Sequence, residues 1–105
     1  MVNPFAGQVE VVIDGVAHPA KLTLGALAGL EAELGAESMI ALVERFEGGQ
    51  FSSRDVMAVL VAGLRGAGWS GGVDDLLAAE FAGGPVGAAD AAAALLARAF
   101  RIEGT

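Results

Sequence analysis

The clearest chemical pattern in the chain surrounds its tryptophan, where Gly68-Trp69-Ser70-Gly71-Gly72 matches the G-x-S-x-G signature of serine hydrolases. In that signature the serine lies on a strand-to-helix turn, and a histidine later in the chain acts as its base. The single histidine, His18, comes before the serine, and the residues preceding Gly68 favour a helix. The pattern therefore does not predict a hydrolase, and we expect no catalytic residues.

The same loop contains Gly66, Gly68 and Gly71 in the order G-x-G-x-x-G. This spacing is typical of dinucleotide-binding proteins only where it closes a strand and opens a helix within a βαβ unit. A helix is expected before these glycines, and no second parallel strand is expected after them. We interpret them as loop residues and expect no cofactor.

A metal site is not expected either. The chain has one histidine and no cysteine, whereas zinc sites are built mainly from these two residue types. Asp74 and Asp75 are adjacent, and adjacent residues of a helix do not share a face. We expect His18 to be an ordinary residue of an edge strand.

Trp69 has two possible roles. In a glycine-rich loop it can cover the core as a lid, or it can be an exposed anchor for a partner, because tryptophan is enriched at binding hot spots. The sequence leaves both roles open.

A β-hairpin is expected before the helices. Apolar residues alternate from Val9 to Ile13 and again from Val16, and Asp14-Gly15 suits a turn whose two central residues need positive φ. We expect strands over residues 8–13 and 16–22, with Pro19 at a bulge or an exposed edge. An isolated hairpin is marginally stable, so it has to pack on the helices or pair with another chain.

Thr23 is expected to cap the first helix, which Gly35 ends, and the second helix is expected to end at Gly48-Gly49. The apolar stripes predicted for these two helices are Leu24, Leu27, Leu30 and Leu34, then Met39, Leu42, Val43 and Phe46.

Ser52 and Asp55 form a capping box for a third helix. Residues 56–64 are apolar on every side, which predicts that this helix is central and that Val59, Leu60 and Leu64 are among the most buried residues.

Asp74 and Asp75 suit the first turn of a fourth helix, which we expect to run to Gly83-Gly84. Its predicted stripe is Val73, Leu76, Leu77 and Phe81. Pro85 can open the last segment, and a final helix is predicted over residues 88–102 with Leu95, Leu96, Ala99 and Phe100 pointing inward.

The expected fold is therefore one α+β domain over residues 1–105, with a β-hairpin in residues 1–22 and four to five short helices in residues 23–105. The net charge is −7, which disfavours binding to nucleic acid or to an anionic membrane surface. Charge-free runs are far shorter than the roughly 20 residues that span a bilayer. No basic residue precedes Lys21, so no signal peptide is expected.

Four segments, in order, resemble a known family. They are a VxxxIDG hairpin at Val9–Gly15, LTLGALAxLE at Leu22–Glu31, RFExGxFSxxDV at Arg45–Val56, and GLRGxGW at Gly63–Trp69. This pattern is similar to that of the small tail proteins of bacterial gene transfer agents and siphophage-like prophages. The resemblance covers about the first seventy residues, and the alanine-rich remainder is compatible but uninformative.

The resemblance implies a non-enzymatic role in building a phage-like tail. The family is grouped with tail assembly chaperones and is also labelled a tail tube component. The implied partner is the tape measure protein, a long helical protein, and/or the major tail tube protein, with a homo-oligomer as a further possibility. The alternative is a structural tube or connector subunit that stays in the particle.

For a chaperone, the resemblance implies a location in the bacterial cytoplasm. For a structural subunit, it implies the phage-like particle. Whether a longer, frameshifted form exists is left open by the sequence.

The resemblance brings no catalytic residues. As partner-binding residues we predict three aromatic side chains, those of Trp69, Phe81 and Phe100.

Overall fold

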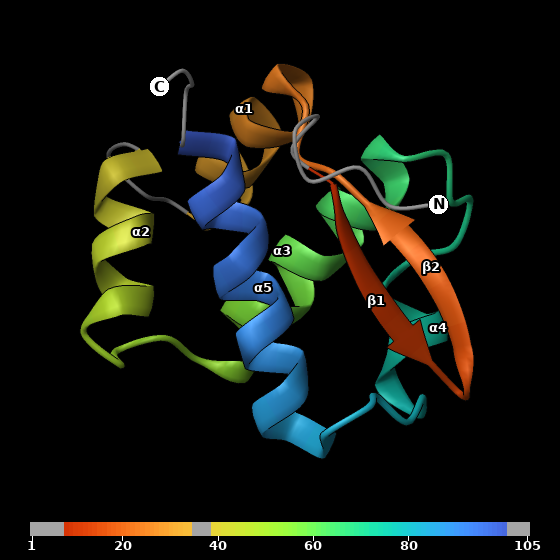
Figure 1. The fold of residues 1–105 in the computed structure, drawn as a ribbon. Helices are drawn as coiled ribbons and strands as arrows, with labels where there is room; N and C mark the ends of the chain where they lie inside the picture. The colour runs from red at the N-terminus through yellow and green to blue at the C-terminus, as the bar shows by residue number, and fades with distance from the viewer. Residues whose placement is uncertain (1–7, 35–38, 101–105) are drawn as a thin grey trace.

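The computed structural model describes residues 8–34 and 39–100, with the side chains of Met39 and Phe100 left out of the description. Within these ranges an N-terminal hairpin is followed by five helices (Figure 1). The elements are β1 (Val9–Ile13), β2 (Val16–Ala20), α1 (Leu24–Leu34), α2 (Met39–Glu47), α3 (Ser53–Gly66), α4 (Val73–Leu77) and α5 (Gly84–Phe100). The predicted α+β architecture is confirmed.

The hairpin turn forms as the sequence predicts. Asp14 and Gly15 have φ values of 51° and 81°, which close the antiparallel pair. Pro19 lies opposite Glu10 in the ladder and is exposed. The second strand ends at Ala20 rather than at Leu22, because the next backbone N–H, that of Lys21, donates to the Gly63 carbonyl oxygen of α3 at 2.8 Å.

The hairpin packs on the core through one face, and the outer edge of β1 pairs with the segment between α4 and α5. Val11, Ile13 and Ala20 are buried in the common core. Residues 80–82 lie along the outer edge of β1, where the Asp14 N–H donates to the Glu80 carbonyl oxygen at 2.7 Å and the Ala82 N–H donates to that of Val12 at 3.1 Å. These bonds hold the segment that links α4 to α5 against the hairpin.

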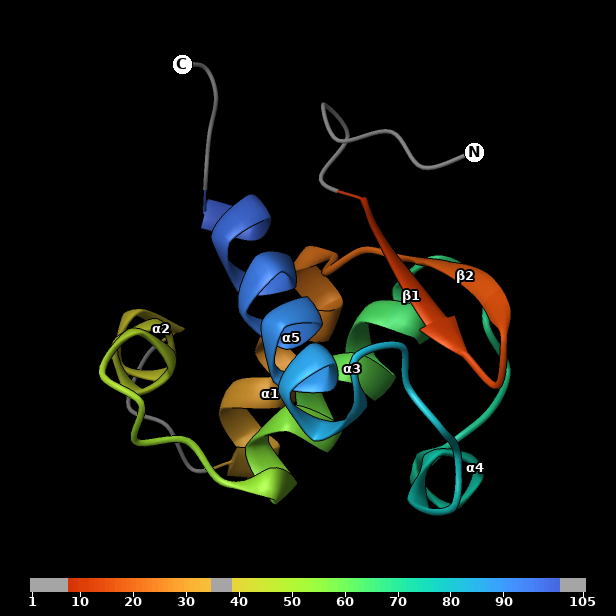
Figure 2. The same cartoon turned by 60° about the horizontal axis from the view of Figure 1, so that its bottom comes forward.

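Helix α3 is the centre of the molecule, as predicted. It contacts α1, α4, α5 and β2, and its side chains at Val59, Leu60 and Leu64 are fully buried. Figures 1 and 2 show α1, α3 and α5 as a central group, with α2 on one side and the hairpin with α4 on the other. At Gly63 a Cβ would lie 3.1 Å from Cδ2 of Leu95, so α3 and α5 pack at close range there.

The start of α3 is fixed by hydrogen bonds and a salt bridge. The capping box forms, with the Asp55 N–H donating to Ser52 Oγ at 3.1 Å and the Ser52 N–H donating to Asp55 Oδ2 at 2.9 Å. The other carboxylate oxygen of Asp55 accepts from Arg45 Nη2 at 2.9 Å, which ties α2 to α3. Phe46 stacks on Phe51 beside this pair, with ring centroids 4.8 Å apart.

One predicted stripe, that of the first helix, differs from the structure at a single residue. Leu24 is 83% exposed, because it lies six positions before the buried Leu30 and thus roughly 120° around the helix from it. Thr23 does cap α1, accepting from the Ala26 N–H at 3.1 Å. The predicted helix end at Gly35 lies outside the described residues, as does the Met39 side chain of the second stripe; Leu42 and Phe46 of that stripe are buried.

The fourth helix is shorter than predicted. It begins with Asp74 and Asp75 in its first turn but ends at Leu77, so Phe81 lies outside it. Val73 and Leu77 are 40% and 68% exposed, and of the predicted stripe Leu76 is the fully buried member. The helix stops because residues 80–82 pair with β1 instead, with Phe81 bridging to Ile13.

The last helix begins earlier than predicted, at Gly84, with Pro85 in its first turn, where a missing backbone N–H costs no hydrogen bond. Leu95 and Leu96 are buried as predicted, and Ala99 is half-buried. Residues 101 and 102 of the predicted helix lie outside the described part. Within that part, no helix is long and apolar enough to cross a bilayer.

Replacing Leu60 by Ala should lower the free energy of unfolding by about 2–5 kcal/mol, because a cavity would open at a fully buried position of the central helix. Urea denaturation followed by circular dichroism measures the change. The matched control is Leu24→Ala on the exposed face of α1, which should change stability by less than about 0.5 kcal/mol. An equally small change for Leu60→Ala would contradict the central position of α3.

Candidate functional site

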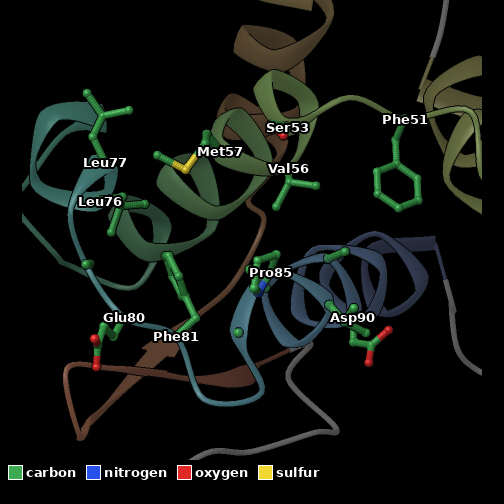
Figure 3. Close-up of a pocket in the computed structure, with 15 residues that line it drawn as sticks. Phe51, Ser53, Val56, Met57, Leu76, Leu77, Glu80, Phe81, Pro85 and Asp90 are labelled. Atoms are coloured by element: carbon green, nitrogen blue, oxygen red, sulfur yellow. The ribbon is translucent and has the colours of Figure 1, made fainter.

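An open apolar groove lies between α3, α4 and the first turns of α5, and has a volume of about 980 Å³ (Figure 3). Most of its lining is aliphatic or aromatic. The residues that line it are Phe51, Ser53, Val56, Met57, Leu76, Leu77, Ala79, Glu80, Phe81, Gly84, Pro85, Val86, Ala88, Ala89 and Asp90.

The groove has a buried floor and exposed apolar rims. Val56, Leu76 and Ala88 on its lining belong to the core. Leu77 on α4 and Val86 on α5 are 68% and 71% exposed, although both are large apolar side chains. Apolar surface therefore continues from the core to the solvent on the α4 side and on the α5 side of the groove.

The chain between α4 and α5 keeps the groove open. After α4 the backbone runs to β1, where the Glu80 N–H donates to Asp14 Oδ1 at 2.9 Å. Gly83 and Gly84 then turn the chain into α5 with φ values of 82° and 67°, a backbone region that favours glycine. This detour to the hairpin separates α4 from α5, and the two helices line different parts of the groove.

The charged side chains that line the groove are both acidic. Glu80 and Asp90 are exposed, and Figure 3 shows them on either side of Phe81 and Pro85. No lysine or arginine belongs to the lining residues named above. The groove thus combines an apolar surface with two negatively charged side chains.

The three predicted partner-binding residues do not form one site. Phe81 is half-buried and lines the groove. Trp69 is half-buried too, but it packs against the core, and its indole lies over Gly71 outside the groove lining. Phe100 ends α5, and its side chain lies outside the description. A binding role for these residues stays a prediction.

Sequence reasoning missed the two exposed rim residues, Leu77 and Val86. The sequence predicts Leu77 in a buried stripe and gives no prediction for Val86. The available signal was weak: an Asp-Asp-Leu-Leu end to a short segment, and a valine between Pro85 and a glycine. Neither pattern shows which of two adjacent apolar residues faces solvent.

The loop with the hydrolase-like pattern has the wrong setting for that chemistry. Ser70 is exposed and follows the end of helix α3, not a strand; α3 ends at Gly66 with Ala67 as its C-cap. The loop is held instead by Arg65, whose Nε donates to the Gly71 carbonyl oxygen at 2.8 Å. Among the residues that the structure describes, no cluster of three metal-ligand side chains is found.

The structure is thus a small α+β domain with an open apolar groove on one face. The family model for phage tail tube protein, GTA-gp10, matches residues 6–102, so the chain belongs to this family of gene transfer agent tail proteins. The match includes the alanine-rich C-terminal part as well as the first seventy residues. A structural tail protein family of this kind is not an enzyme class.

No curated protein matches the chain, and no solved structure does. The family match and the geometry of the chain itself are therefore the basis for its function.

Replacing Gly71 by Ala should displace Trp69, because a Cβ at this position would overlap the indole ring. The fluorescence emission of Trp69, the chain's single tryptophan, should then shift to longer wavelength as the ring becomes more exposed. Gly29→Ala is the matched control, since nothing lies within 4 Å of its Cβ position and the residue is inside α1. This control should leave the emission unchanged and stabilise the protein by up to about 1 kcal/mol. Unchanged emission in Gly71→Ala would show that the ring does not cover Gly71.

Proposed function

We propose that this gene transfer agent tail protein is a tail assembly chaperone that binds the tape measure protein through the groove between α3, α4 and α5. The observation that carries the proposal is the apolar, solvent-exposed lining of this groove, with Leu77 and Val86 at its rims. Burying a leucine or valine side chain is worth about 1.5–3 kcal/mol, so these side chains offer binding energy that the isolated domain leaves unused.

The shape of the groove suits a helix. A helix presents an apolar stripe at positions i, i+3, i+4 and i+7, and an open groove can take such a stripe without any change in the partner's backbone. The tape measure protein is expected to be long and helical, with apolar faces that aggregate when they are not covered. A chaperone that covers them one segment at a time would keep that protein in solution.

A limited contact also suits a protein that has to leave again. One groove on a domain of 105 residues engages a short length of a partner, whereas permanent subunit interfaces commonly bury 2,000 Å² or more. Many copies along one long partner would add up to stable coverage. Each copy could still be displaced as tube subunits polymerise.

The alternative is a structural subunit of the tail tube or a connector, retained in the finished particle. It is favoured by the description of the family as a tail tube protein. Under this alternative the groove would be filled by a neighbouring tail subunit rather than by the tape measure protein. The bacterial cytoplasm is the working location of a chaperone, and the particle is that of a subunit.

Co-expression with the tape measure protein of the same gene cluster should increase the soluble yield of that protein and give a complex that co-purifies. Leu77→Gln should weaken this complex by at least about tenfold, because it removes an apolar rim residue. Leu24→Gln is the matched control: this leucine is 83% exposed but lies on α1, away from the groove lining. Binding assays with both purified variants, after circular dichroism has verified their folds, measure the effect.

Mass spectrometry of purified particles separates the two functions. A chaperone should be absent or present at trace levels, whereas a subunit should be present in stoichiometric amounts. A stoichiometric protein that does not bind the tape measure protein would overturn the chaperone proposal and establish the structural alternative.

A further inference from the structure

We infer that the groove between α3, α4 and α5 selects an amphipathic helix whose apolar face is bordered by lysine or arginine. This inference rests on the proposed function and adds the chemistry of the bound segment. It is carried by the combination of an apolar lining with two acidic side chains, Glu80 and Asp90, that belong to that same lining.

The two carboxylates are available to a partner. Both residues are exposed. Within residues 8–34 and 39–100, the salt bridge of the structure joins Arg45 to Asp55, so neither Glu80 nor Asp90 has a cationic partner there. Asp90 lies on α5, whereas Glu80 lies on the segment that runs along β1, so the negative charge comes from two separate elements.

Charge complementarity then indicates that the partner's residues at this contact are positively charged. A helix with its apolar stripe over Phe81 and Pro85 would place the residues beside that stripe near Glu80 and Asp90, which Figure 3 shows on either side of these two residues. Basic residues at those positions would gain favourable contacts, while acidic ones would be repelled. The net charge of −7 on the whole chain adds a long-range attraction for the same kind of basic partner.

The same charges disfavour a second copy of this chain as the occupant. Two copies each carry a net charge of −7, and the groove adds two acidic groups at the contact. A groove made for self-association would be expected to carry opposite charges on its two contacting surfaces. We therefore assign the groove to a different, basic-flanked chain.

Two synthetic peptides of about 18 residues test this selection. Both carry leucines at i, i+3, i+4 and i+7 spacing. One has lysines beside the stripe, the other has glutamates at the same positions, and each bears a fluorophore for anisotropy titration. The full-length protein should bind the lysine peptide about threefold to tenfold more tightly at low salt, and most of this preference should disappear at about 1 M salt.

The double variant Glu80→Gln and Asp90→Asn should remove most of the preference while the apolar contact persists. The matched control is Glu44→Gln and Glu47→Gln, two exposed acids on α2 that lie outside the groove lining. The control changes the net charge by the same amount, so it should keep most of the preference. Circular dichroism and urea denaturation verify that both double variants fold.

Four results of the peptide titrations would overturn the inference. They are equal binding of the two peptides, binding of neither peptide, a preference that survives Glu80→Gln with Asp90→Asn, and an equal loss of preference in the control. Sedimentation equilibrium that shows a dimer dispersed by Leu77→Gln would assign the groove to a second copy and overturn it too. If the tape measure protein still co-purifies with the Glu80→Gln, Asp90→Asn variant at full affinity, the charge selection fails while the proposed function stands.

Discussion

The central, largely buried position of α3 is the constraint on which the rest of the molecule depends. The chain has no cysteine, and a domain of 105 residues needs a well-packed core when no disulfide supports it. Helices α1, α4 and α5 and strand β2 all contact α3, and Val59, Leu60 and Leu64 are fully buried among them. The hairpin is part of this arrangement, because the Lys21 N–H bonds directly to the Gly63 carbonyl oxygen of α3.

The position of α4 follows from the same constraint and creates the groove. The single turn of α4 buries Leu76 in the core, and the chain then leaves to pair with β1 before returning as α5. Because this detour keeps α4 apart from α5, the rims of the groove retain exposed apolar side chains. The element that completes the core thus also produces the surface that we propose for partner binding.

Local signals predicted most of the fold. The Asp14-Gly15 turn and the Ser52–Asp55 capping box depend on residues close in sequence, and both form as expected. The apolar pattern of residues 56–64 likewise predicted that α3 is buried. The error at α4 occurs where pairing with a distant segment decides the structure: α4 ends early because residues 80–82 pair with β1, a contact across about 70 positions of the chain that no local pattern encodes.

The candidate site was less predictable for the same reason. Phe81 lines the groove, and its partner-binding role stays a prediction. The sequence predicts Leu77 in a buried stripe and makes no prediction for Val86. Exposure of these two side chains depends on the separation of α4 from α5, which is a tertiary feature. The family resemblance supplied the protein class, whereas the location of a binding surface required the structure.

Hydrogen–deuterium exchange of the protein with and without the tape measure protein tests the central claim most directly. The account predicts slower exchange on binding at residues 76–90 and at the start of α3, which together line the groove, with little change in α1. Slower exchange confined to α1 or to the hairpin, with residues 76–90 unchanged, would contradict the groove as the docking surface.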